Sequence, residues 1–155
     1  MTHEERQKMI DKIEALPAQL RATIAGATEA QLMRPYRDGG WNSRQVIHHL
    51  ADSHVMAYIR AKKVVSEDNP ALQAYDQDVW AAHADGSTGP LEPSLAIIEG
   101  VHARWAAFLR SLPESAWTRT AVHQERGPMT LEDLLRIYSG HGEKHIGHIK
   151  AGLAG

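Results

Sequence analysis

The sequence predicts an all-α protein, a four-helix bundle with a long crossover connection between its second and third long helices. Four segments repeat apolar residues at spacings of three and four, which places those residues on one face of a helix. No segment shows the convincing apolar and polar alternation of a half-buried strand. The apolar content of 43% is enough to build a core in a chain of 155 residues.

Length and composition narrow the class of protein. We expect residues 1–155 to form a single domain, because no linker, repeat or low-complexity tract interrupts the chain. The formal net charge of −2, without a long run of one sign, disfavours nucleic-acid and membrane-surface partners. No apolar run approaches the roughly 18 residues of a membrane span, and the mixed-charge N-terminus does not resemble a signal peptide. We therefore expect a soluble, cytoplasmic protein.

The chain contains no cysteine. Disulfides, CxxC zinc sites and a cysteine nucleophile are therefore excluded. Any metal ion must be held by histidine or oxygen ligands. Any thiol that takes part in a reaction must come from another molecule.

The first long helix is predicted from about residue 4 to residue 27. Its apolar stripe has the helical spacing and consists of Met9, Ile10, Ile13, Leu16, Leu20 and Ile24. Pro17 lies inside this segment, so a kink or a restart of the helix is expected there. The Gly/Pro-rich turn PYRDGGW follows.

The second long helix is predicted to begin near Asn42 or Ser43 and to end near Ser66. Both residues at its start are good N-caps, and Gln45 stands at capping-box spacing from Asn42. Its apolar stripe consists of Val46, Leu50, Ala57, Ala61 and Val64.

Residues 67–93 form the long connection. A short helix is predicted around the stretch YDQDVWAA. Connections of this length in a compact domain are often lids or walls of a functional site, and a plain crossover between bundle helices is the alternative.

The third long helix is predicted to start near Pro93, a suitable first-turn residue. Its apolar residues are Leu95, Ile98, Val101, Trp105, Phe108, Leu109 and Leu112. The stretch PESAW can add a short turn of helix, and a small hairpin between residues 118 and 128 is an alternative to an irregular segment. The fourth long helix opens at Thr130, with Asp133 at capping-box spacing, and continues through Ile149.

Two histidines of the fourth helix share its apolar face. His141 and His145 are four residues apart, which places them on one side of the helix with Tyr138 and Ile149. His148 falls near the edge of the same stripe. We expect His141 and His145 to face the bundle core.

The second helix contains three histidines within the stretch HHLADSH. His49 is aligned with Val46 and Ser53 at spacings of three and four, so it faces inward. His48 is about 100° further round the helix and is predicted to face solvent or a partner. His54 lies on the other margin of the stripe.

These positions direct imidazoles from two helices into one core. A His-x-x-x-His pair can present two nitrogens to one ion, and a facing helix can add a third. Three neutral imidazoles suit zinc, nickel or iron and leave coordination positions open for water or substrate. Hydrogen-bonded core histidines are the alternative, which spacing does not exclude. The stretch HGEKH is not an HExxH motif, because Glu143 lies about 200° round the helix from His141.

Several longer stretches together resemble one family. PYRDGGW, HHLADSH, the pair YD followed by a tryptophan, and the closing HxxxH occur in the order found in the YfiT-type proteins classed as metal-dependent hydrolases, within the DinB-like superfamily. The resemblance runs from about residue 10 to residue 150. It implies a four-helix bundle of DinB/YfiT-like type, with one divalent metal ion per chain held by His49, His141 and His145. It also implies zinc or nickel as the metal, a small-molecule substrate and a homodimer.

The resemblance leaves the reaction open. A hydrolase that activates water at the metal is the first reading. The related bacillithiol S-transferases suggest an alternative, in which a low-molecular-weight thiol is conjugated to an electrophile. Both reactions are compatible with a metal that lowers the pKa of its ligand. A non-catalytic metal-binding scaffold is the second alternative.

No general base is identified by the sequence. Asp52 stands three residues after His49 and is a candidate neighbour of the site, with a solvated carboxylate as the alternative. The long connection carries Tyr75, Asp76, Asp78 and Trp80, and this cluster predicts that the connection forms part of the wall over the metal. Capping and packing of a short helix is the alternative for these residues. The four tryptophans are expected in the core and at its rim.

Overall fold

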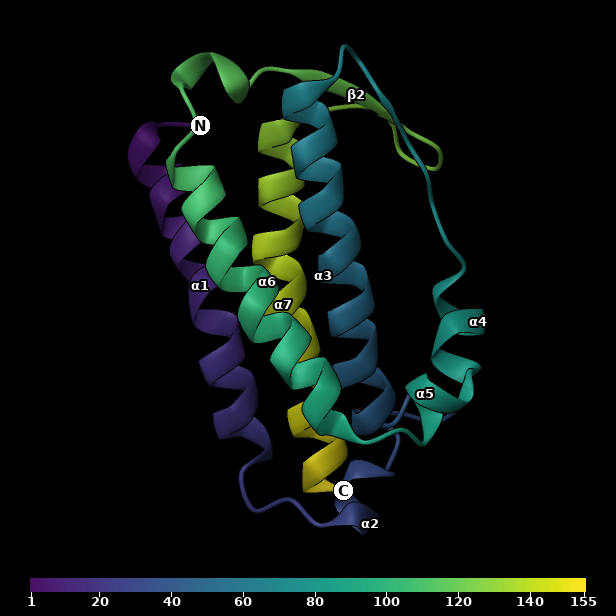
Figure 1. The fold of residues 1–155 in the computed structure, drawn as a ribbon. Helices are drawn as coiled ribbons and strands as arrows, with labels where there is room; N and C mark the ends of the chain where they lie inside the picture. Colours follow the sequence, from purple (N-terminus) through teal and green to yellow (C-terminus); the bar gives the residue numbers. More distant parts are fainter.

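The computed structural model describes residues 1–155 and contains four long helices that pack side by side (Figure 1). They are α1 (His3–Ile24), α3 (Ser43–Ser66), α6 (Leu91–Arg110) and α7 (Leu131–Ala154). Both α1 and α3 pack against α6 and α7, so α1 and α3 lie on one diagonal of the bundle. This confirms the predicted four-helix bundle with a crossover. None of the helices is long and apolar enough to span a membrane.

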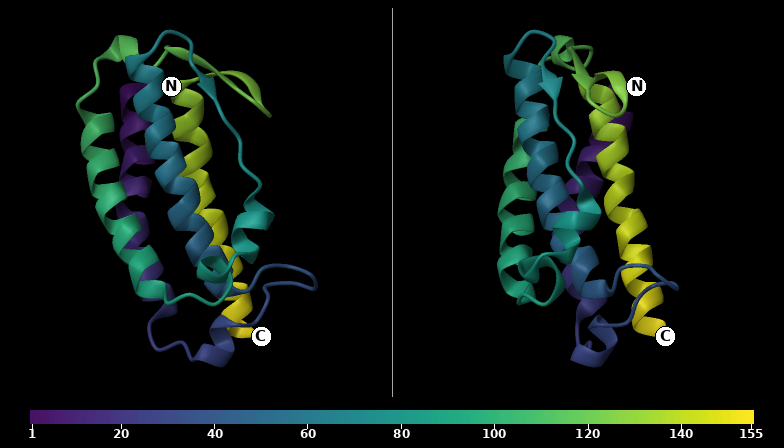
Figure 2. Two further views of the ribbon diagram at one scale, coloured as in Figure 1. Left: turned by 45° about the vertical axis from the view of Figure 1, so that its right-hand side comes forward. Right: turned by 90° about the vertical axis from the view of Figure 1, so that its right-hand side faces the viewer.

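A small sheet closes the end of the bundle near the N-terminus (Figures 1 and 2). Strand β1 (Ala71–Leu72) pairs in parallel with β2 (Thr120–His123), and β2 pairs antiparallel with β3 (Gly127–Thr130). The hairpin considered for residues 118–128 is therefore present. Strand β1, which the sequence did not predict, ties the start of the long connection to it.

The remaining short elements lie in the connections. They are α2 (Glu29–Leu32), α4 (Gln77–Ala82), α5 (Ala84–Ser87) and the 3₁₀ turn η1 (Glu114–Ala116). Helix α4 is the short helix predicted around YDQDVWAA, and η1 is the turn predicted at PESAW. From the sheet, the connection between α3 and α6 descends beside α3 to α4 and α5 (Figure 2).

The starts of two long helices confirm the predicted capping boxes. Asn42 caps α3 and pairs reciprocally with Gln45, and Thr130 caps α7 and pairs reciprocally with Asp133. Each pair satisfies two backbone N–H groups that the first helical turn leaves without partners. Both helices that carry the site histidines therefore begin at positions set by local sequence.

Three predicted boundaries differ from the structure. Helix α1 is one α-helix with Pro17 inside it, so of the kink or restart expected there the restart is wrong; the buried Ile13, Leu16 and Leu20 hold both halves in the core. This helix also ends at Ile24 rather than near residue 27. Helix α6 begins at Leu91, before Pro93, because Pro90 stands at its N-cap. Packing of a complete apolar face outweighs the single hydrogen bond that a proline removes.

The core consists of two apolar clusters stacked along the bundle axis. The cluster nearer the sheet includes Ile10, Ala57, Trp105 and Leu135, and the other includes Leu20, Leu50, Ile98 and Ile149. On α3, α6 and α7, histidines occupy the positions between the two clusters: His54, His102, His141 and His145. A polar layer therefore crosses an otherwise apolar interior.

Candidate metal centre

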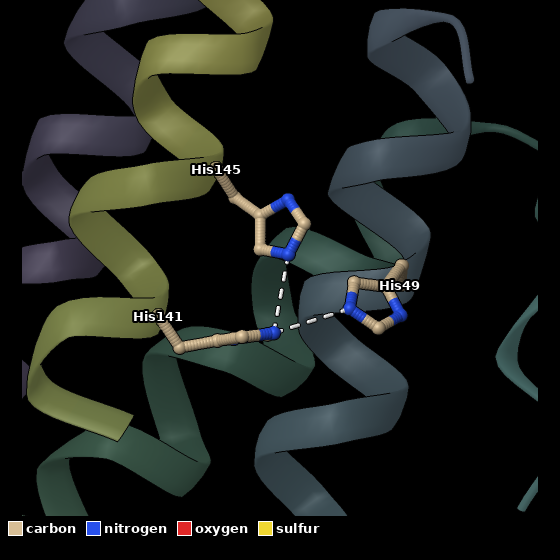
Figure 3. Close-up of side chains that lie close together, drawn as sticks. All are labelled: His49, His141 and His145. Atoms are coloured by element: carbon tan, nitrogen blue, oxygen red, sulfur yellow. Dashed lines mark hydrogen bonds between the residues drawn. The ribbon is translucent and has the colours of Figure 1, made fainter. Parts of the chain in front are cut away.

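The Nε2 atoms of His49, His141 and His145 converge in the polar layer between α3 and α7 (Figure 3). His141 Nε2 lies 3.3 Å from His49 Nε2 and 3.1 Å from His145 Nε2. The three ligand atoms all lie within 4.8 Å of one another. The i, i+4 spacing of the two α7 residues and the inward face of α3 produce this convergence, as the sequence predicts.

The arrangement fits a divalent ion. In a tetrahedral zinc site with Zn–N bonds of about 2.0–2.1 Å, ligand nitrogens are about 3.3–3.4 Å apart, and the two Nε2 contacts of His141 are close to this separation. A ligand must also be neutral, with its lone pair free. Burial lowers the pKa of His49 to about 4 and that of His141 to about 3, and it lowers that of His145 as well. The three histidines could therefore hold a metal ion at neutral pH.

A cavity of about 630 Å³ opens beside two of these histidines. His49 and His141 lie in its wall, which also carries both cationic and anionic side chains: Arg60, Arg126, Asp76, Asp78 and Glu125. Residues 74–78 of the long connection form one part of this wall, and residues 123–126 of the β2–β3 hairpin form another. The prediction that the connection forms part of the wall of the site is confirmed for residues 74–78.

Comparison with known proteins identifies the family. The sequence model of the DinB superfamily matches residues 12–149. The chain belongs to the DinB superfamily. It is 41% identical over 150 residues to "Putative metal-dependent hydrolase YfiT" of Bacillus subtilis, which covers 96% of this chain and 84% of that protein. It is 44% identical over 140 residues to "Putative metal-dependent hydrolase OB0782" of Oceanobacillus iheyensis, which covers 90% of this chain and 81% of that protein.

A solved DinB-superfamily structure has the same fold. The structure of Bacillus subtilis YfiT superposes with a TM-score of 0.93, covering 96% of this chain and 86% of that one at 41% identity. It is described as "a probable metal-dependent hydrolase with an unusual four-helix bundle topology". The bundle topology and the family are thereby established for this chain.

One predicted histidine position in this DinB-superfamily chain is wrong. His48 does not face solvent or a partner, because the turn before α6 covers that side of α3 and leaves His48 only 6% exposed. The carbonyl of Gly89 accepts a hydrogen bond from His48 Nε2 at 3.1 Å, which makes His48 Nδ1 the acceptor for Ser94 Oγ at 2.7 Å. Both ring nitrogens are therefore used in packing α3 against α6.

The carboxylates take different positions. Asp52 is half-buried and is not part of the cavity wall, and burial together with Asp85 raises its pKa. Asp76 lies in the wall and also caps α4 by accepting from the Asp78 and Val79 amides. Glu143 is exposed and pairs with Lys12 at 3.0 Å, so it faces away from the site as predicted.

The aromatic residues divide between the core and the rim of the site. Trp105 and Trp117 are buried in the apolar cluster nearer the sheet. Trp80 packs on Tyr75 with ring centroids 4.3 Å apart, and Tyr75 lies in the cavity wall. Trp41 lies beside His49, with centroids 4.8 Å apart.

Two histidines of the polar layer were missed by sequence reasoning. His54 and His102 are 1% and 0% exposed, respectively, and lie behind His141. A signal for His102 was available, because it continues the α6 stripe at spacings of four from Ile98 and three from Trp105. His54 lay at the margin of the α3 stripe, where the helical spacing does not separate core from surface.

Proposed function

We propose that the protein is a metal-dependent enzyme, of hydrolase type, in which His49, His141 and His145 hold one zinc or nickel ion per chain. The observation that carries the proposal is the convergence of three neutral imidazoles beside a polar cavity. When bound, such an ion acts as a Lewis acid with free coordination positions and lowers the pKa of a water or thiol placed there.

The protein supplies binding and orientation rather than a nucleophile. The chain has no cysteine, and the histidines that face the cavity are kept neutral by burial. Arg60 and Arg126 offer cationic groups, and Asp76, Asp78 and Glu125 offer anionic groups, at the cavity wall. These side chains suit a polar small molecule that carries charge.

A thiol S-transferase is the second candidate. The cavity of about 630 Å³ is larger than an attacking water requires and falls within the usual size of small-molecule sites, roughly 300–1,000 Å³. It therefore has room for a low-molecular-weight thiol of bacillithiol type together with an electrophile. Because the chain has no cysteine, that thiol must come from outside.

Metal analysis tests the ligand set. We expect about one equivalent of zinc or nickel in the purified protein, and a large loss of metal in His49→Ala and His145→Ala. His83→Ala is the surface control because His83 is exposed, and His48→Ala is the control on α3; both should retain metal. Undiminished occupancy in either ligand variant removes that residue from the set.

A paired activity screen tests the reaction. The metal-loaded protein is incubated with panels of esters, amides and electrophiles, with and without a small thiol. Metal-dependent cleavage without thiol supports the hydrolase, and loss of an electrophile only with thiol supports the transferase. Activity in neither arm favours a non-catalytic scaffold. A covalent protein–substrate adduct during turnover, or full activity after metal removal, would contradict the mechanism.

The remaining assignments are also proposals. We infer a homodimer located in the cytoplasm that acts on small molecules and binds neither nucleic acid nor membranes. The cavity lined by charges of both signs supports a small-molecule substrate and does not provide a uniformly basic surface for nucleic acid. Light scattering at several protein concentrations measures the oligomeric state.

A further inference from the structure

A continuous series of hydrogen bonds runs behind His141 and involves all four long helices. His141 Nδ1, on α7, lies 2.9 Å from His54 Nε2 on α3. His54 Nδ1 lies 2.8 Å from His102 Nε2 on α6. His102 Nδ1 lies 2.5 Å from the backbone carbonyl oxygen of Ile13 on α1. The series therefore links the edge of the cavity to the backbone of the helix diagonal to α3.

At the Ile13 end of the series, donor and acceptor are fixed. A carbonyl oxygen can only accept, so His102 Nδ1 must carry the hydrogen of the bond to Ile13. In a neutral ring the other nitrogen, His102 Nε2, is then a lone-pair acceptor, and His54 Nδ1 must donate to it. By the same step, His54 Nε2 accepts and His141 Nδ1 donates.

His141, the last ring of the series, determines whether a lone pair or a hydrogen points toward the metal centre. Neutral His141 with its hydrogen on Nδ1 has its lone pair on Nε2, and Nε2 is the atom that approaches His49 and His145. The opposite direction of donation would place a hydrogen on His141 Nε2 and block it as a ligand. One backbone carbonyl thus sets the direction for three rings.

The surroundings keep these rings neutral. Trp105 packs edge-on against both His54 and His102, and Tyr138 packs edge-on against His54. His54 is 1% exposed and His102 is 0% exposed, so water cannot reach either ring to solvate a positive charge. The series is therefore the uncharged arrangement described above.

The other two candidate ligands have no such support. His145 Nδ1 is buried and has no hydrogen-bond partner. His49 is hydrogen-bonded only through Nε2, within the cluster itself. His141 is thus the one candidate ligand whose remote nitrogen is anchored by the protein.

We propose that His54 and His102 are positioning residues that fix His141 as the Nδ1–H tautomer and aim its Nε2 lone pair at the metal. The metal-binding half of this inference rests on the proposed function, whereas the tautomer is a property of the metal-free protein. Hydrogen bonds in series polarise one another, so the same contacts strengthen His141 as a donor of its lone pair.

The first experiment observes the tautomer directly. Metal-free protein labelled with ¹⁵N-histidine is studied by long-range ¹H–¹⁵N correlation, which distinguishes protonated from lone-pair ring nitrogens. We expect the hydrogen of His141 on Nδ1 in the unmutated protein. A hydrogen on Nε2 overturns the proposal, whatever the metal measurements show.

The second experiment removes the hydrogen bond between His54 and His141 and then restores it. His54→Leu fills similar space without a donor or acceptor, so His141 should lose its single tautomer and Zn²⁺ affinity should fall about 10–100-fold. His54→Gln carries one acceptor and one donor and should restore most of the affinity. His102→Leu should lower the Zn²⁺ affinity less than His54→Leu does, and His102→Gln should restore most of that loss.

His48→Leu is the matched control, because His48 is another buried histidine of α3 and its hydrogen bonds lie outside the series. It should leave the His141 tautomer and the Zn²⁺ affinity unchanged. Unmutated affinity in a folded His54→Leu protein overturns the positioning role. If the unmutated protein binds neither Zn²⁺ nor Ni²⁺, the proposed function fails, while the ¹⁵N result still decides the tautomer. If His54→Leu does not fold, the Gln variants and the unmutated spectrum decide it.

Discussion

At the residue scale, the two glycines of α7 that flank His141 have opposite packing environments. A Cβ at Gly142 would lie 2.7–2.8 Å from the Leu16 methyl carbons of α1, whereas a Cβ at Gly140 would meet nothing within 4 Å. Gly142 therefore lets α1 and α7 approach closely beside the site. Gly140 has no such role.

These glycines give a matched stability prediction. Gly140→Ala should stabilise the helix by up to about 1 kcal/mol, the usual helix-interior difference. Gly142→Ala gains the same helix term but overpacks Leu16, at a cost of about 1–3 kcal/mol, so it should be less stable than Gly140→Ala. Urea unfolding of both variants measures the difference. Equal stabilities would mean that Leu16 moves aside freely.

Residue by residue, the sequence predicted the ligand candidates better than their neighbours. His49, His141 and His145 were placed inward by spacing on their own helices, and they converge. The buried state of His48 depends on Ser94 and the carbonyl of Gly89, more than forty positions away. Helical spacing describes one helix and contains no information on which loop will cover its outer face.

At the element scale, the connection over the site is tied down by a buried arginine. Arg60 of α3 is 5% exposed, donates to Tyr138 Oη at 3.0 Å, and donates to the carbonyl of Gln73, the residue directly before the wall segment 74–78. One guanidinium thus joins α3, α7 and the connection. The wall therefore depends on Arg60 for its position.

Replacing this guanidinium should loosen the wall without unfolding the bundle. In Arg60→Met, the hydrogen bond to Gln73 is lost, and amides of residues 73–78 should exchange with solvent several-fold faster. Hydrogen–deuterium exchange with mass spectrometry measures this change. Arg104→Met, on the exposed side of α6, is the control and should leave the segment unchanged. Unaltered exchange in Arg60→Met would assign the support to other contacts.

The cap of α7 gives a second prediction at this scale. Thr130 Oγ1 accepts from the Asp133 amide at 3.1 Å, so Thr130→Ala should destabilise the protein by about 1 kcal/mol. Thr118→Ala, at an exposed loop position, should change stability little. Thermal unfolding of both variants checks the difference, and equal melting temperatures would contradict the capping role.

The elements that the sequence predicted well have local signals in the sequence. Helices α3 and α7 begin at capping boxes that can be read from four residues. Helix α2 also has one, formed by Thr28 and Gln31, which sequence reasoning overlooked. Strand β1 has only two residues, and its pairing with Val122 and His123 depends on chain segments about fifty residues away.

At the scale of the whole molecule, the buried histidines couple stability to pH. Burial lowers the pKa of His49 to about 4, whereas an unfolded histidine has a pKa of about 6.5. Between these values the unfolded chain binds more protons than the folded chain, so the free energy of unfolding decreases as pH falls. The stabilising contribution is complete above about pH 6.5 and is lost toward pH 4.

We therefore expect metal-free protein to lose stability between about pH 6.5 and 4, by up to about 1.4 kcal/mol per pH unit for each such histidine. Carboxylates act in the same direction near the acid end. His49→Asn, which removes one of the titrating groups, should therefore flatten the profile relative to the unmutated protein, and the exposed-site variant His83→Asn should not. Urea unfolding at half-unit pH intervals measures the slopes. Parallel profiles for all three proteins would contradict this account.

The division of the site between helices and loops has a consequence for how this architecture can change. The histidines stand on α3 and α7, which the two apolar clusters hold in place, whereas most of the cavity wall comes from residues 74–78 and 123–126 outside the bundle. Substitutions in these loops can alter which molecules are accommodated at little cost to the fold or to the histidines. New binding specificities can therefore arise, in nature or by directed evolution, while the three-histidine cluster is inherited intact.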